Sequence, residues 1–437
     1  MPPASDVPAS RPLVPPPGLW RETGFRRLWA GQTASQFGEQ ATLIVLPLIA
    51  VLALNADAGQ LGVLRAAGQA PLLLLPLFVG AWVDGWRTRT VMVLADLGRA
   101  MVLCGAAAGL LGGLGLPALL VVAFAVGSLS VFFDVAYQAS LVRLVKRDQL
   151  VQGNSALEGS RSAAQIGALA LGGVLATVLP APIAAASSVP FFVLSFLSIR
   201  RIRRDEPVPE RSPHPPPVWR QIHEGLRFVA GHALLRTVGL ASAAFQFSFA
   251  AMMTGYLLFL TRELHLAGTA VGLALAATGP GALLGSLLAA RLPIRFGYGA
   301  VLVSAAAIGD GVMLCVPALH GPAAVTIPAL VAVNFVFGTF GQLVNVTIMA
   351  VRQASTPGGM QGRVAATITF AGMGLTPLGS LLGGFLGLEW GLRTALVVTA
   401  AGMMLSPLLM AVSPLARLGR ALPAGPWHDG CGGNSAG

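Results

Sequence analysis

Three carboxylates interrupt long apolar stretches of this 437-residue chain: Glu39, Asp134 and Asp310. A charge in an apolar environment costs about 2.5–3.5 kcal/mol on insertion scales, so each of these groups needs a partner, a proton or a function. The stretch around Glu39 is the most polar in the first half of the chain, and it also contains Gln32, Ser35, Gln36 and Gln40. This pattern makes Glu39 and Asp134 our candidates for carrying a proton.

Each carboxylate also has a purely structural interpretation. Glu39 can line a cavity and take up a proton, or it can pair with a basic residue such as Arg65 or remain neutral; both interpretations stay open. For Asp134 we favour an ion pair with Arg161 or Arg99. For Asp310 a functional role is the less favoured interpretation.

Further polar side chains inside the apolar stretches indicate which positions line a cavity. The candidates are Gln32, Gln36, Gln40, Arg65, Gln246, Asn334 and Asn345. Aromatic residues at 245, 247, 249 and 256 are candidates for an aromatic wall, although packing against lipid or neighbouring residues is the favoured interpretation for any one of them. So few charges favour a neutral or amphipathic solute over a highly charged one.

Sequence motifs for enzymatic chemistry are missing. The chain has no G-x-x-x-x-G-K-[ST] nucleotide loop and no H-E-x-x-H, and its three cysteines, Cys104, Cys315 and Cys431, lack metal-ligand spacing. We therefore expect no enzyme activity, no metal and no cofactor.

The composition identifies the elements that hold these polar groups. Apolar residues make up 55% of the chain and charged residues 10%, far from the roughly 25% charged residues of a soluble protein. About 20 apolar residues span a bilayer, which predicts an all-α polytopic membrane protein with twelve transmembrane helices. The expected spans cover residues 27–53, 61–83, 90–112, 117–140, 154–178, 181–199, 234–260, 268–290, 299–318, 323–349, 363–387 and 391–414.

Basic residues gather on one side of these spans. With the N-terminus in the cytoplasm, the inner loops hold nearly all of the loop arginines, and only Arg65, Arg262 and Arg393 fall on the outer side. This is the distribution that the positive-inside rule predicts. It explains the formal net charge of +11 without nucleic acid and places both termini in the cytoplasm of a bacterial-type inner membrane.

The loops divide the chain into five parts. We expect a disordered tail over 1–22, a six-helix half over 23–199, a cytoplasmic linker over 200–232, a second six-helix half over 233–415 and a tail over 416–437. The end of the linker carries Trp219, Ile222, Leu226 and Val229 at helical spacing, which predicts an amphipathic helix on the inner leaflet.

An internal repeat relates the two halves. The pattern of residues 62–92 returns at 271–301, an offset near 209, and residues 143–153 match 353–363 at nearly the same offset. Two halves with an even number of helices have the same topology, so a cavity between them at mid-membrane is the expected solute site.

The loop Gly80-x-x-x-Asp84-Gly85-x-Arg87-x-Arg89 resembles motif A of the major facilitator superfamily, although Gly85 stands where that motif usually has arginine. The stretches 132–139 and 159–167 resemble the enterobactin-exporter-like branch, and the resemblance covers roughly residues 25–415. It implies a gate on the cytoplasmic side formed by Gly80, Asp84, Arg87, Arg89 and Arg99, with Asp84 at a helix N-terminus.

The resemblance and Glu39 together predict a secondary transporter that exports a small amphipathic solute, such as a drug or a siderophore-like metabolite, by proton antiport with alternating access. An importer or facilitator is the alternative within transport, and a non-transporting membrane sensor or scaffold is the alternative from another class. The expected partners are the solute, protons and the lipid bilayer, without nucleic acid, and the expected unit is a monomer.

Overall fold

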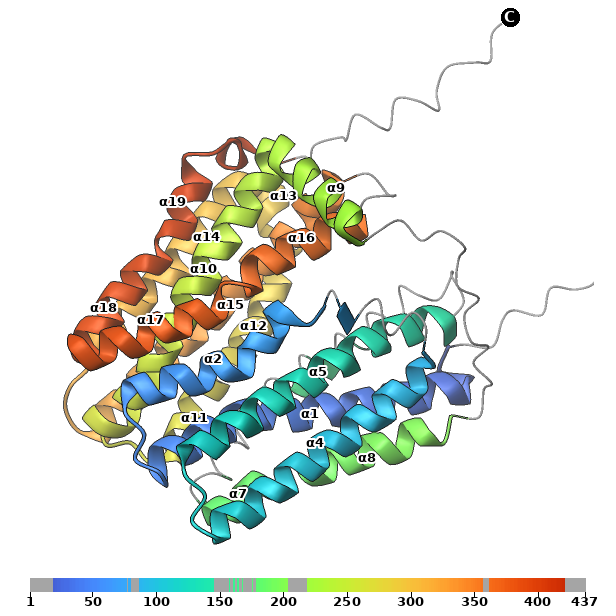
Figure 1. The fold of residues 1–437 in the computed structure, drawn as a ribbon. Helices are drawn as coiled ribbons and strands as arrows, with labels where there is room; N and C mark the ends of the chain where they lie inside the picture. The colour runs from blue at the N-terminus through green and yellow to red at the C-terminus, as the bar shows by residue number, and fades with distance from the viewer. Residues whose placement is uncertain are drawn as a thin grey trace, which may run out of the picture.

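The computed structural model describes residues 19–76, 78–79, 86–144, 178–202, 218–356 and 361–420, together with a few separate positions between 157 and 175. Every element in this described part is a helix, and the helices form two bundles (Figure 1). The N-terminal bundle comprises α1 (Thr23–Leu52), α2 (Ala58–Leu74), α4 (Thr88–Leu111), α5 (Leu116–Leu144), α7 (Ala181–Ala186) and α8 (Val189–Arg200), preceded by the short η1 (Leu19–Arg21).

The C-terminal bundle follows the helix α9 (Val218–Gly231), which packs against α10 and α16. Its elements are α10 (Ala233–Leu258), the π-helical turn η3 (Phe259–Glu263), α11 (Gly268–Ala276), α12 (Thr278–Ala289), α13 (Leu292–Phe296), α14 (Tyr298–Val312), η4 (Met313–Ala318), α15 (Ala323–Ala354), α16 (Gln361–Met373), α17 (Thr376–Glu389), α18 (Leu392–Met403), α19 (Leu405–Ala411) and η6 (Pro414–Arg417).

The expected membrane spans correspond closely to these helices. Ten helices among the described residues are long and apolar enough to cross a membrane. The predicted span 61–83 corresponds to α2, which has 17 residues and packs between α5 and α17. The predicted span 154–178 lies largely outside the described residues.

In three spans of the C-terminal half, a proline explains the break between two α-helices. A proline has no N–H to donate to the carbonyl four residues earlier. The helices α11, α16 and α18 end at Ala276, Met373 and Met403, four residues before Pro280, Pro377 and Pro407. At the break before Pro377 a threonine hydroxyl stands in as donor, because Thr376 bonds to the Met373 carbonyl at 2.5 Å.

The two ends of the molecule differ. One end, which we call the basic end, carries the start of α1 and α4 and the end of α8, where Arg27 and Arg89 donate to the backbone carbonyls of Arg201 and Arg200. The other end, the short-loop end, carries the tight connections at residues 53–57 and 112–115.

Contact between the two halves is concentrated on α2 and α17 in the described part of the chain (Figure 1). Glycines allow this close approach: a Cβ added to Gly62 would lie 2.7 Å from the Ser380 carbonyl oxygen and 2.9 Å from Cα of Gly384. Small residues let helix backbones approach in this way within a membrane. One apolar core cluster runs through both halves here and contains Leu61 and Leu64 together with Tyr256.

A side chain from the π-helical turn completes the junction. Arg262 donates to the backbone carbonyls of Asn55 at 3.0 Å and Ala56 at 2.5 Å, in the connection between α1 and α2. The next residue, Glu263, accepts from Arg393 at 2.7 Å at the start of α18. The turn therefore joins the N-terminal half to the rest of the C-terminal half at the short-loop end.

Candidate functional site

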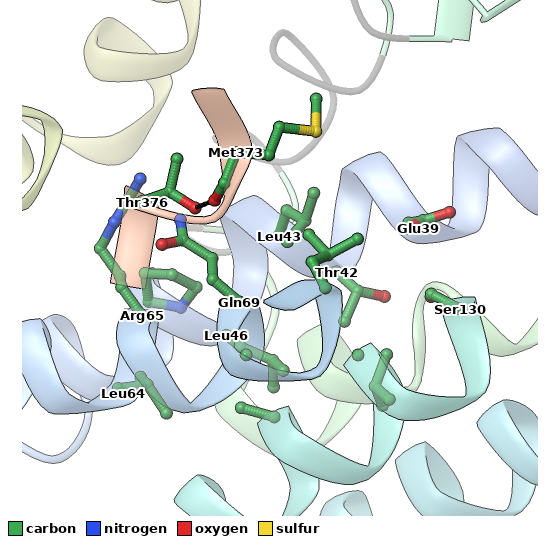
Figure 2. A pocket seen from close by; sticks show the side chains of 16 residues that line it. Glu39, Thr42, Leu43, Leu46, Leu64, Arg65, Gln69, Ser130, Met373 and Thr376 are labelled. Atoms are coloured by element: carbon green, nitrogen blue, oxygen red, sulfur yellow. Dashed lines mark hydrogen bonds between the residues drawn. The ribbon is translucent and has the colours of Figure 1, made fainter. Parts of the chain in front are cut away.

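A cavity of about 270 Å³ lies among α1, α2 and α5, and Met373 and Thr376 of the other half contribute to its wall. Glu39 and Ser130 lie on one side of this N-half cavity, and Arg65, Gln69 and Thr376 gather on the other (Figure 2). The lining between them is mostly apolar, with Leu43, Leu46, Pro47, Leu64 and Leu72 among its members. The cavity is therefore an amphipathic space with one carboxylate and one guanidinium.

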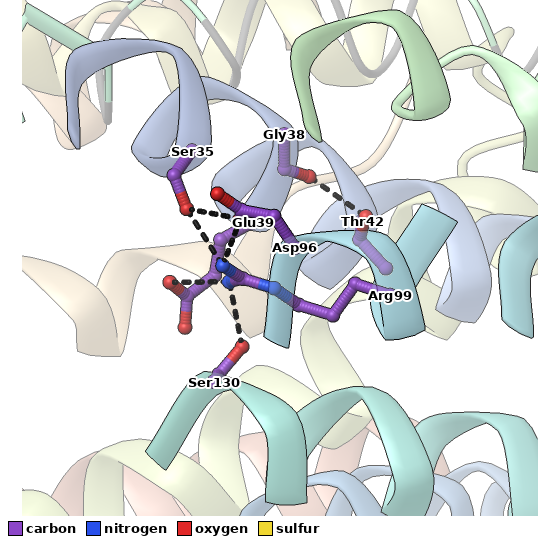
Figure 3. Close-up of polar contacts among 7 residues, drawn as sticks. All are labelled: Ser35, Gly38, Glu39, Thr42, Asp96, Arg99 and Ser130. Atoms are coloured by element: carbon purple, nitrogen blue, oxygen red, sulfur yellow. Dashed lines mark hydrogen bonds and ion pairs between the residues drawn. The ribbon is translucent and has the colours of Figure 1, made fainter. Parts of the chain in front are cut away.

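A fully buried arginine, Arg99, lies next to Glu39. Arg99 of α4 donates to Ser35 of α1 at 2.8 Å and to Ser130 of α5 at 3.2 Å, and it pairs with Asp96 at 2.5 Å (Figure 3). Its guanidinium carbon lies 4.7 Å from the ring centre of Phe133 and 4.5 Å from that of Phe192. Charge-assisted hydrogen bonds and aromatic faces together stabilise a cation that has left water.

Local sequence explains why α4 presents this pair to its neighbours. Asp96 and Arg99 are three residues apart and so lie on one face of the helix. Between them, Gly98 leaves room for α5, since a Cβ there would lie 2.9 Å from Leu129. The ion pair is thus held at the place where α1, α4, α5 and α8 meet.

Glu39 interacts with the same guanidinium at a longer distance. Its Oε2 atom lies 3.8 Å from Nη1 of Arg99, and its side chain is 18% exposed, whereas Asp96 and Arg99 are fully buried. Glu39 Oε2 makes no hydrogen bond in the described structure. Arg99 therefore has Asp96 as its close partner, and Glu39 is a second, looser carboxylate beside the same guanidinium.

Asp134 of α5 belongs to the same electrostatic cluster. It interacts with the charges of Glu39, Arg161 and Arg99. This is the neighbourhood that the sequence suggested for Asp134, extended by a second carboxylate.

Arg65 lies across the cavity from Glu39 and does not pair with it. Its Nε atom is buried without a hydrogen-bond partner in the described structure. Gln69, one turn further along α2, accepts from Ser380 of α17 at 3.0 Å, a hydrogen bond between the two halves. The basic residue beside Glu39 is therefore Arg99, at 3.8 Å, and not Arg65, which the sequence had suggested as its partner.

A second cavity of about 360 Å³ lies within the C-terminal half, among α10, α14, α15, α16 and α19. Gln246, Asn345, Asp310 and Arg352 line it, and Met373 lines both cavities. Two of the amides predicted from the sequence, Gln246 and Asn345, therefore face a cavity in the half that lacks Glu39.

The remaining predicted cavity residues lie elsewhere. Gln32 and Gln36 are buried in the helix packing of α1, and Gln40, which is partly exposed, lines neither of the two cavities. Asn334 is buried and donates to the Tyr256 hydroxyl and to the Leu330 carbonyl, both at 2.8 Å. These contacts give Asn334 a packing role.

The residues expected to form the gate do not all lie together in the structure. Gly80 and Asp84 lie outside the described residues, Arg87 is exposed directly before α4, and Arg89 reaches the end of α8. Arg99 is ten residues beyond Arg89, about 15 Å deeper at 1.5 Å per residue. Arg99 therefore belongs with Glu39 and away from the basic end.

Sequence reasoning missed Asp96, which is the closest partner of Arg99. The signal was present, because an acidic and a basic residue three positions apart inside an apolar helix indicate a buried ion pair. It also missed Arg352 as a lining residue of the second cavity, since Arg352 is only two residues from the end of α15.

Comparisons with known proteins agree with this architecture. The sequence pattern of the transmembrane secretion effector family matches residues 16–429. A multidrug efflux pump, Tap, of Mycolicibacterium fortuitum is 27% identical over 390 residues, covering 86% of this chain and 92% of the pump. An MFS-type transporter of Mycobacterium tuberculosis is 28% identical over 378 residues, covering 80% of this chain and 83% of that transporter.

Solved structures show the same fold. A bacterial homologue of the iron transporter ferroportin in an inward-facing state superposes with a TM-score of 0.68 at 18% identity, covering 90% of this chain and 98% of that one. A bacterial homologue of the lysosomal transporter Spinster, in an inward-facing and occupied conformation, superposes with a TM-score of 0.69 at 13% identity, covering 90% of this chain and 96% of that one. With the family pattern matched over almost its whole length, the chain belongs to the transmembrane secretion effector family of the major facilitator superfamily, whose members are membrane transporters and not enzymes.

Proposed function

We propose that this transporter exports a small amphipathic organic solute, of the drug or siderophore type, in exchange for protons. The observation that carries the proposal is the position of Glu39, a carboxylate at the wall of the N-half cavity and 3.8 Å from a fully buried arginine. The relatives named as multidrug efflux pumps support export of a drug-like solute.

The charges around Glu39 support proton exchange. Three carboxylates, Glu39, Asp96 and Asp134, interact with two guanidiniums, those of Arg99 and Arg161. Arg65 lies on the opposite wall of the cavity. Of these three carboxylates, Glu39 is the one that lines the cavity, which makes it our candidate for the group that exchanges protons with the solution.

Alternating access gives the proton a direction. We place the basic end in the cytoplasm, in accordance with the positive-inside rule. The state described here is joined at the short-loop end through α2 and α17, so the cavities would face the cytoplasm, as in the inward-facing relatives of known structure. Solute would then load from the cytoplasm while Glu39 releases its proton there.

The domain division proposed from the sequence fits this cycle. The halves over 23–199 and 233–415 would rock against each other, with the linker over 200–232 as tether and the tails over 1–22 and 416–437 outside the bundle. Asp84, Arg87 and Arg89 would close the basic end in the opposite state, and Arg99 would act through Glu39.

Transport in inverted membrane vesicles tests the proposal. Vesicles that contain the wild-type protein and have an acidic interior should accumulate fluorescent amphipathic solutes, which are chosen from a panel of drugs and siderophores. An uncoupler should abolish this accumulation. Glu39→Gln should lose gradient-driven accumulation but retain exchange of dye down its own gradient, because the cavity itself is preserved.

Glu389→Gln is the matched control, since Glu389 is exposed at the end of α17 and distant from Arg99. This control should accumulate dye at the wild-type rate. Proton coupling through Glu39 would be refuted by gradient-driven accumulation in Glu39→Gln equal to that of the control. Uptake into right-side-out vesicles would instead support the importer alternative.

A further inference from the structure

The second cavity, which lies within the C-terminal half and which we call the C-half cavity, contains a carboxylate that the proposed proton exchange does not use. Asp310 of α14 is only 5% exposed, and its Oδ2 atom has no hydrogen-bond partner in the described structure. It forms no ion pair with any described residue. A lone carboxylate at this depth is costly, and such groups in membrane proteins mark binding sites or ion paths.

Space and shape around Asp310 suit a ligand. The cavity of about 360 Å³ is bordered by small residues, including Gly309, Gly341 and Gly372, which leave room beside the carboxylate. The amides of Gln246 and Asn345 line the same space. A dry packing defect would be lined by apolar side chains alone, whereas this cavity combines apolar walls with a few polar groups, as ligand sites do.

One aromatic ring, that of Phe245, lines the cavity and packs against two further rings outside the lining. Phe245 lines it and is stacked on Phe249 at 5.4 Å between ring centres, and both rings are stacked near Phe337 of α15, at 6.5 and 5.5 Å. An aromatic face attracts a cation, and it also stacks with a planar ring. A carboxylate and an aromatic wall in one cavity together favour a positively charged aromatic group.

The other charged side chain that lines this cavity among the described residues is Arg352. It lies two residues from the end of α15, whereas Asp310 lies twelve residues beyond the start of α14 at the same end, so the two are separated by about 15 Å along the helix axes. Arg352 therefore stands near the basic end and leaves the Asp310 end of the cavity negative.

We propose that the C-half cavity binds the positively charged group of an aromatic organic cation, with Asp310 as its counterion and Phe245 as its stacking face. The proposal rests on the proposed transport of an amphipathic organic solute. Because Met373 lines both cavities, the solute site in the C-terminal half adjoins the proton site in the N-terminal half. Charge recognition and proton exchange thus use different carboxylates, Asp310 and Glu39.

Binding to the purified full-length protein in detergent tests this site without any proton gradient. The probes are ethidium, an aromatic cation, and Nile red, a neutral aromatic dye, followed by fluorescence. Asp310→Asn should weaken ethidium binding about tenfold or more, since one partner of a desolvated charge pair is removed, while Nile red binding stays within about twofold. Asp310→Glu should retain ethidium binding, because it keeps the charge.

Two further variants separate this result from the proposed function. Arg352→Gln should bind ethidium more tightly than wild type, because it removes a positive charge from the cavity lining, and Glu389→Gln, at an exposed position outside both cavities, should bind it like wild type. Because binding is measured without a proton gradient, a loss of proton coupling in the vesicle assay would leave these affinities unchanged. Equal ethidium affinity in Asp310→Asn and wild type would overturn the proposal. So would an equal loss in Asp310→Asn and Asp310→Glu, because charge would then not be the cause.

Discussion

Arg99 faces two carboxylates at unequal distances, and this inequality gives them different roles. Asp96 at 2.5 Å is a permanent partner, and Glu39 at 3.8 Å is a partner that can be given up. Removing one member of a buried ion pair costs several kcal/mol, whereas protonating the looser partner leaves the tighter pair intact. The proposed exchange therefore requires the shape of the guanidinium as well as its charge.

We predict that Arg99→Lys destabilises the protein. An ammonium group cannot contact Ser35, Ser130 and Asp96 together in the planar arrangement of a guanidinium, nor stack between two rings. We expect a loss of about 2 kcal/mol, the value of one or two charged hydrogen bonds, and a lower thermal unfolding midpoint in detergent.

The control for this change is Arg291→Lys, at an exposed position directly before α13. It should leave the midpoint unchanged. An Arg99→Lys protein as stable as this control would show that the network contributes little beyond its net charge.

The sequence revealed Glu39 because a carboxylate inside an apolar stretch is conspicuous. It could not reveal the partner: Arg99 is 60 residues away, and Arg65 was an equally reasonable choice before the helices were packed. Asp96 could have been found from its spacing to Arg99, and the C-half cavity could not, because five helices contribute to it.

Among the elements, α2 and α17 carry the contact between halves, and glycines set their distance. A Cβ at Gly62 would lie against backbone atoms of α17, which cannot rotate away. A Cβ at Gly59, three residues earlier on α2, would meet only side-chain atoms, of Asp57 and Leu388, at 3.4 and 3.6 Å. Alanine is therefore expected to be disruptive at the first position and tolerated at the second.

We predict that Gly62→Ala shifts the protein away from the state closed at the short-loop end. Overpacking costs about 1–3 kcal/mol, enough to change the ratio of two states by about tenfold or more. Spin labels at exposed positions 111 and 325, with Cys104, Cys315 and Cys431 replaced by serine, should report a longer distance population. In Gly59→Ala the distribution should match wild type; the same distribution in both variants would contradict the role of Gly62.

The helix breaks were partly predictable from sequence. Pro280, Pro377 and Pro407 are visible in the sequence inside apolar stretches, and the proline rule places each break four residues upstream. The π-helical turn Phe259–Glu263 has no such local signal, because it depends on where Arg262 and Glu263 find their partners.

For the whole molecule, hydropathy predicted the spans and the charge distribution predicted their orientation. We expect the basic end to face the cytoplasm with both termini. A fluorescent protein fused after residue 437 should therefore be bright, and alkaline phosphatase fused there should be inactive. Alkaline phosphatase inserted at Gly321, in the connection before α15, should be active; the reverse pattern would place the basic end outside.

Arg262 recognises the path of a backbone and not the side chains along it. Both of its acceptors are carbonyl oxygens, in a connection where Asn55 adopts a left-handed conformation with φ of 51°. A substitution at position 56 would keep the acceptor, although Ala56 is buried in the core and leaves room only for a small side chain, and asparagine or glycine at position 55 would keep the turn. Inserting or deleting one residue there would displace both oxygens, so the contact of Arg262 depends on the length of this connection.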